Sequence, residues 1–95
     1  MPQAVRSGTL TPSTVATVSN AQDVTEFAVT HHGNVTAPLY VRGDGVNPTV
    51  KGNDCYPVLP GQTKWLGRTR TAATDDGTAI KIISASAADY SVEFP

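Results

Sequence analysis

Short runs of alternating apolar and polar residues, separated by turn residues, run through most of this sequence. The last run is the clearest, because Tyr90, Val92 and Phe94 alternate with Ser91 and Glu93. Successive side chains of a β-strand point to opposite faces, so such a run buries one face and exposes the other. About seven runs of this kind predict an all-β fold, a small antiparallel β-sandwich.

Clusters of glycine, proline, asparagine and aspartate bound the predicted strands. The strands cover residues 14–19, 24–31, 37–42, 55–59, 64–68, 78–84 and 90–94. Pro57 interrupts the fourth run and cannot donate a ladder hydrogen bond, so this run must be an edge strand or carry a bulge. Such an edge offers a place for strand addition by a neighbour. Pro60-Gly61 predicts a tight turn in which Gly61 is free to adopt a positive φ.

The first 13 residues show no sustained period and contain two prolines and a glycine. We therefore expect residues 1–13 to form an extended arm outside the sandwich and residues 14–95 to form a single β-sandwich domain. In this interpretation the arm is ordered by a neighbouring subunit, with Arg6 and Leu10 as contact candidates. Removing the arm should then leave the sandwich folded.

The composition favours a thin core that depends on partners. Threonine occurs 13 times and valine 11 times among 95 residues, while Leu, Ile, Val and Phe together number 20. The single cysteine, Cys55, cannot form an intramolecular disulfide. A net charge of −1 provides no excess charge to attract nucleic acid or an anionic membrane. We therefore expect neither partner, and we expect a homo-oligomer, with a trimer favoured.

The sequence contains no run of 18 apolar residues, and its N-terminus lacks the basic-then-apolar pattern of a signal peptide. Both observations lead us to expect synthesis and folding in a cytoplasm.

The residues that could carry chemistry have simpler explanations. His31 and His32 are adjacent, and adjacent strand residues point to opposite faces, so the pair cannot easily bind one metal ion. Cys55 has no base and orienting group near it in the sequence and is best interpreted as a small buried residue. We therefore expect no catalytic residues, no enzymatic activity, no cofactor and no metal site.

The acidic residues fall in predicted turns, where they cap backbone N–H groups. A calcium site formed by Asp44, Asn47, Asn53 and Asp54 is a less favoured alternative, since their spacing matches no EF-hand loop.

Two further patterns could recognise a partner. The tripeptide 42–44 reads Arg-Gly-Asp on a predicted turn, but turn chemistry already explains it. Lys64, Trp65 and Arg68 belong to a basic stretch. Strand alternation places Trp65 on the face opposite to the two cations, which disfavours binding to single-stranded nucleic acid. Trp and Arg are enriched at interface centres, so we interpret Trp65 and Arg68 as protein-contact candidates.

Residues 38–50 with 58–61, together with 80–85 and 90–94, resemble small β-sandwich proteins encoded among the structural genes of tailed bacteriophages, especially those infecting actinobacteria. The likeness covers residues 24–94. It rests on an Asp-Gly turn, a Pro-Thr pair, a Leu-Pro-Gly turn and a closing pair of strands. Such proteins are virion components: minor capsid or decoration proteins, head fibres, and collar or tail accessories.

The resemblance implies a non-enzymatic structural protein of the virion that binds the capsid shell and stabilises the particle. Its partners would be the major capsid protein or other virion subunits. The alternative is a receptor- or carbohydrate-binding module of a tail, collar or head fibre, and a role outside the virion is also open.

Alternation further predicts a core made of nine residues: Phe27, Val29, Leu39, Val41, Ile80, Ile82, Tyr90, Val92 and Phe94. Replacing Ile82 with Ala should lower the free energy of unfolding by about 2–4 kcal/mol, measured by chemical denaturation, because a cavity replaces buried methyl groups. A solvent-exposed Ile82, or a helix longer than two turns, would contradict this prediction.

Overall fold

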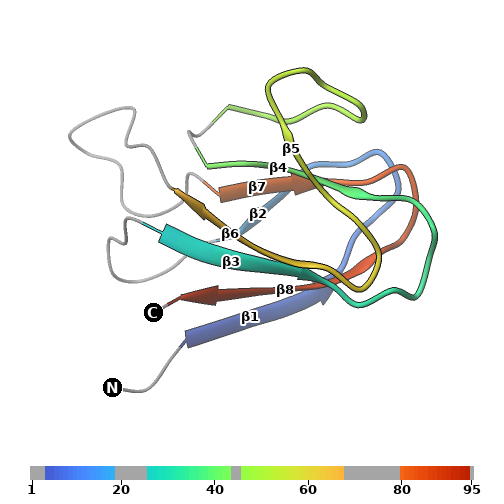
Figure 1. Cartoon of the computed structure of the whole chain (residues 1–95). Helices are drawn as coiled ribbons and strands as arrows, with labels where there is room; N and C mark the ends of the chain where they lie inside the picture. The colour runs from blue at the N-terminus through green and yellow to red at the C-terminus, as the bar shows by residue number, and fades with distance from the viewer. Residues whose placement is uncertain (1–3, 19–25, 44–45, 68–79, 95) are drawn as a thin grey trace.

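The protein is an all-β sandwich, as predicted. The computed structural model describes residues 4–18, 26–43, 46–67 and 80–94, and these contain eight strands and no helix. The strands are β1 (Ala4–Thr9), β2 (Ala16–Val18), β3 (Glu26–His31), β4 (Leu39–Arg42), β5 (Tyr56–Val58), β6 (Thr63–Gly67), β7 (Ile80–Ile83) and β8 (Asp89–Phe94). They form sheet A, in the order β1-β8-β3-β6, and sheet B, in the order β2-β7-β4-β5 (Figure 1).

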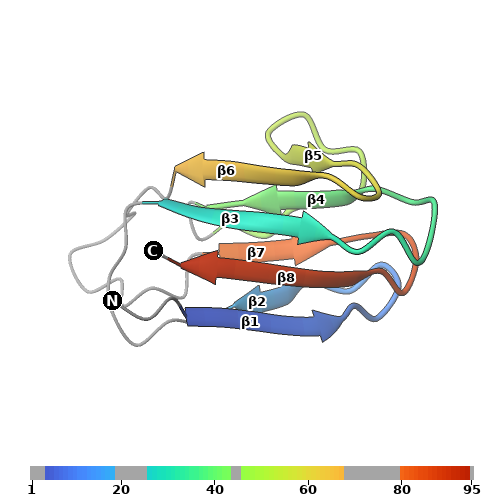
Figure 2. The same ribbon diagram turned by 60° about the horizontal axis from the view of Figure 1, so that its bottom comes forward.

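Sheet A lies against sheet B, and their inner faces form the core (Figure 2). All strand pairs are antiparallel. Eight of the nine predicted core residues are buried, and Tyr90 is partly buried against the others. Ile82 is fully buried. The core also contains Leu10, Val18, Val58, Leu66 and Ala88, which alternation did not single out.

The N-terminal arm is a correction to the sequence analysis. Residues Ala4–Thr9 form β1, an edge strand of sheet A that pairs with β8 along its whole length. Leu10 follows the strand and is only 2% exposed, within the core. The boundary expected at residue 13 therefore cuts through the sandwich, and the strand count rises from about seven to eight.

The period was missed in β1 because two of its three inward positions, Arg6 and Gly8, do not carry an apolar side chain. Arg6 and Gly8 occupy the inward register, opposite Val92 and Tyr90. A Cβ at Gly8 would lie 3.0 Å from the Tyr90 hydroxyl, so the glycine leaves room for the tyrosine side chain.

Two turn and edge predictions are confirmed. β5 contains Pro57 and is the edge strand of sheet B beside β4. Gly61 has a φ of 79°, and the Gln62 N–H donates to the Leu59 carbonyl over 2.9 Å, which closes the predicted turn.

His31 joins three chain segments at one end of the sandwich. Its side chain is fully buried. The Gly33 N–H donates to His31 Nδ1 (2.8 Å), so Nε2 carries the ring proton and donates to the Ala37 carbonyl (2.9 Å). Its backbone carbonyl accepts from the Gly61 N–H (3.0 Å). One residue thereby fixes the end of β3, the following loop and the turn before β6.

Replacing His31 with Ala should lower the free energy of unfolding by about 2–4 kcal/mol, because it leaves a cavity and unpairs the Gly33 N–H and the Ala37 carbonyl. Chemical denaturation measures the change. The matched control is His32→Ala, which removes an exposed imidazole and should change the unfolding energy by less than about 1 kcal/mol. Equal effects of the two substitutions would refute the role given to His31.

Deleting residues 1–13 should unfold the sandwich or lower its stability by more than about 3 kcal/mol. The truncation removes the β1–β8 ladder and Leu10, and it exposes the buried side of β8. Circular dichroism and denaturant titration measure the loss. A chain lacking only residues 1–3 is the control, since β1 begins at Ala4. A truncated chain that unfolds at the same denaturant concentration as the full chain would restore the arm interpretation.

Candidate functional site: the open face of sheet A

The two outer faces of the sandwich differ in how much of the chain covers them. On sheet B, Ile83 pairs with Tyr40 and alternates with the inward Ile82, so its side chain points outward. Ile83 is nevertheless only 6% exposed, and Pro48 in the connection between β4 and β5 is also buried. Figure 1 shows the described part of this connection, residues 46–55, looping out beyond sheet B, on the side away from sheet A. Sheet A has no described segment crossing its outer side in the same view.

We call the outward side chains of sheet A the open face. One row across it runs through four strands, from Val5 to Glu93, Ala28 and Trp65. Ala28 is buried although it points outward, because larger side chains flank it on both neighbouring strands. Val5 is 49% exposed and Trp65 is 52% exposed. The row therefore has an exposed apolar side chain at each edge of the sheet.

The next row consists entirely of hydroxyl side chains: Ser7, Ser91, Thr30 and Thr63. The Ser7 and Ser91 hydroxyls are 2.8 Å apart, as are those of Thr30 and Thr63. His32 Nε2 lies 2.7 Å from the Ser91 hydroxyl. In each hydroxyl pair one oxygen donates to the other, so one O–H of the Thr30–Thr63 pair is left to donate outward.

Three carboxylates stand among the outward side chains described on this face. Among the described residues, its outward ionisable side chains are Glu26, Asp89 and Glu93, together with His32. Thr9 donates to the Asp89 carboxylate over 2.6 Å. Among the described residues, the open face thus combines a row of hydroxyls, three carboxylates and an indole at one side.

The four contact candidates have different positions. Trp65 lies on the open face, on β6. Arg6 is exposed on β1 but occupies the inward register. Leu10 is buried in the core and so is not available to a partner, which corrects its assignment. Arg68 lies outside the described residues. Sequence analysis missed the hydroxyl row, although serine and threonine on the polar side of the alternation were its signal.

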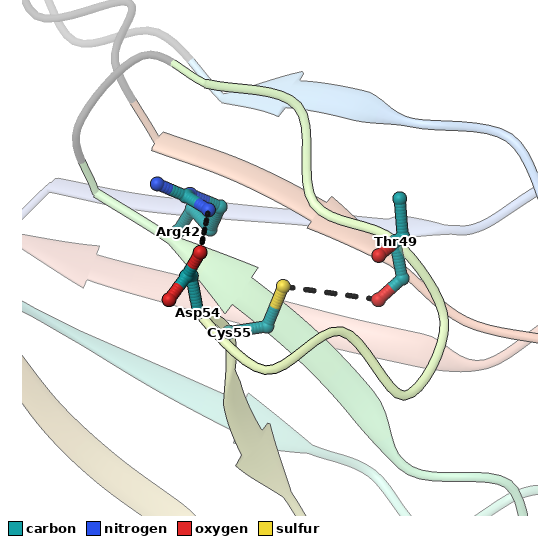
Figure 3. Close-up of polar contacts among 4 residues, drawn as sticks. All are labelled: Arg42, Thr49, Asp54 and Cys55. Atoms are coloured by element: carbon teal, nitrogen blue, oxygen red, sulfur yellow. Dashed lines mark hydrogen bonds and ion pairs between the residues drawn. The ribbon is translucent and has the colours of Figure 1, made fainter.

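A shallow cleft of about 440 Å³ lies at the other end of the molecule from His31. Its walls are Arg42, Gly43, Asn53, Asp54, Cys55, Tyr56 and Gly67. The Arg42 guanidinium lies 3.7 Å from the Asp54 carboxylate, and the Cys55 thiol donates to the Thr49 carbonyl over 3.7 Å (Figure 3). The arginine of the Arg-Gly-Asp tripeptide is therefore held within the chain, while Asp44 lies outside the described residues.

The two histidines and the cysteine lie at three different places and do not form one reactive group. The His31 ring is enclosed in the core, His32 bonds Ser91 on the open face, and Cys55 lines the cleft. In the part of the chain that the structure describes, no group of three His, Cys, Asp or Glu side chains could hold a metal ion. No described helix is long and apolar enough to cross a membrane.

Comparison with protein families, with curated proteins and with solved structures found no match to this chain.

Proposed function

We propose that this chain is a non-enzymatic structural protein of a phage virion that binds the capsid shell through the open face and stabilises the particle. The observation that carries the proposal is the half-exposed indole of Trp65 on a sheet face that no described segment covers. Exposed tryptophans on flat surfaces are typical centres of protein interfaces. The sequence resemblance to virion proteins supplies the kind of partner.

The chemistry of the open face defines what its partner must present. Glu26 and Asp89 favour a basic surface, and the indole requires an apolar recess. The partner in this proposal is the major capsid protein or another virion subunit.

The size of the open face argues for attachment in several copies. Four strands that lie about 4.8 Å apart and are five or six residues long form a face with a projected area of roughly 350 Å². A stable interface buries about 800 Å² on each partner. One copy bound by this face alone would therefore be held weakly, whereas a homo-oligomer on a repeating lattice gains from multivalent attachment. A trimer matches the local threefold sites of a capsid lattice and is the oligomer that we propose.

A second candidate function is a receptor- or carbohydrate-binding module of a tail, collar or head fibre. The observation that favours it is the indole beside a row of hydroxyls on the same face. An aromatic ring provides a flat apolar platform for a sugar ring, and neighbouring hydroxyls can bond its hydroxyl groups.

Replacing Trp65 with Ala should weaken binding to phage particles by about 30-fold or more, equivalent to about 2 kcal/mol, because the largest exposed apolar side chain of the open face is lost from the interface. Co-sedimentation of purified chain with particles lacking it measures the affinity. The matched control is Tyr56→Ala, which removes an equally exposed aromatic side chain, 52% in both cases, from the cleft end of sheet B. The control should bind like the unaltered chain.

Two results would contradict the proposal. Equal binding by the unaltered chain and Trp65→Ala would remove the open face from the interface. If particles retain neither protein while a glycan array retains the unaltered chain and not Trp65→Ala, the module of the second candidate is the better conclusion.

A further inference from the structure

One inward row of sheet A has a cation at each end. The strand register places Arg6 beside Val92, Val92 beside Val29, and Val29 beside Lys64. Val29 and Val92 are fully buried in the core. Arg6 and Lys64 occupy the same inward side on the two edge strands, β1 and β6, and their side chains remain exposed or partly exposed.

Both cations bond to a backbone carbonyl near an edge of the sandwich. Lys64 Nζ reaches from β6 to β5 in the other sheet and donates to the Pro57 carbonyl over 3.3 Å. Arg6 Nη1 donates to the carbonyl of Val5 over 3.3 Å.

The Val5 carbonyl points to the free edge of sheet A. The Leu10 N–H donates to the Ala88 carbonyl (3.0 Å), which sets the phase of the β1–β8 ladder. In an antiparallel ladder the hydrogen-bonded pairs alternate. Val5, Ser7 and Thr9 therefore turn their N–H and C=O groups away from β8. Arg6 thus covers an acceptor that an added strand would need.

The edge strands of sheet B, β2 and β5, are also poor sites for strand addition, but for a different reason. β2 and β5 have three residues each. The central residue of β5, Pro57, has no N–H to offer, and its carbonyl already accepts from Lys64. Strand addition near residues 55–59, which the sequence predicted, would therefore have neither donor nor free acceptor at Pro57.

We propose that Arg6 and Lys64 are edge guards that prevent strand addition by a second copy of this chain. A strand added to β1 or β6 would extend the inward row beyond the cation and enclose its charge between apolar side chains. Removing that charge from water is costly, so the added strand is rejected. The guards leave the faces of the sandwich free, and this role does not depend on what binds the open face.

The test compares Arg6→Val and Lys64→Val with the unaltered chain by sedimentation velocity over a range of concentrations. Each guard variant should self-associate at least tenfold more tightly than the unaltered chain. The control is Lys81→Val, which makes the same substitution as Lys64→Val and the same change in charge as Arg6→Val, on the central strand β7. The control should sediment like the unaltered chain.

A second substitution identifies the edge as the site of association. Ser7→Pro removes an N–H that faces the free edge without breaking the β1–β8 ladder. The double variant Arg6→Val with Ser7→Pro should return to the association state of the unaltered chain. Circular dichroism checks that each variant keeps its strands. If Arg6→Val does not fold, Lys64→Val alone decides the outcome.

The proposal is overturned if the guard variants sediment like Lys81→Val. It is also overturned for β1 if the tighter association of Arg6→Val persists in the presence of Ser7→Pro, since the new contact would then not use the edge.

Discussion

In a thin sandwich, the inward side of a sheet is buried at its centre but meets water at its edges. The inward row of sheet A shows how this chain satisfies both environments. Val29 and Val92 fill the centre of the row, and the same row ends in Arg6 and Lys64 where the sandwich meets water. Burial of the central side chains stabilises the fold, since each buried aliphatic side chain contributes about 1.5–3 kcal/mol. The cations at the ends limit how far the sheet can extend. The same row therefore contributes to the stability of sheet A and, in our proposal, limits its width.

The ends of the sandwich are held by side chains that replace missing backbone partners. His31 bonds the Gly33 N–H and the Ala37 carbonyl within the core. Asn34 likewise bonds one backbone N–H and one backbone carbonyl, at the surface: its side chain accepts from the Asp89 N–H (2.8 Å) and donates to the Ala87 carbonyl (3.1 Å). These contacts fix the loops next to β3 and β8, the two central strands of sheet A. The two central strands of the open face consequently have their ends fixed by side-chain hydrogen bonds.

The sequence was sufficient to predict the sandwich, because alternation in β3, β4, β7 and β8 directly reflects which side chains are buried. It failed at β1, where Arg6 and Gly8 stand at inward positions and remove the apolar period. Trp65 could be predicted as a contact residue from its residue type alone. Whether its side chain is accessible, however, depends on which outer face of the sandwich the rest of the chain covers. That follows from the path of the β4–β5 connection, as the burial of Pro48 and Ile83 shows, and no local pattern encodes it. The bonds of His31 were missed for the same reason, since they join residues whose approach is set by the loop.

In our proposal this chain attaches to its partner by the outer face of sheet A and not by an edge strand. Electron cryo-microscopy of particles carrying the chain would show which surface meets the shell. We expect density in which β8, β3 and β6 face the shell, with the Trp65 side chain at the contact and a gap between β1 and any strand of the shell. Density that places sheet B against the shell, or that continues the β1 edge into a strand of a neighbouring subunit, would contradict it.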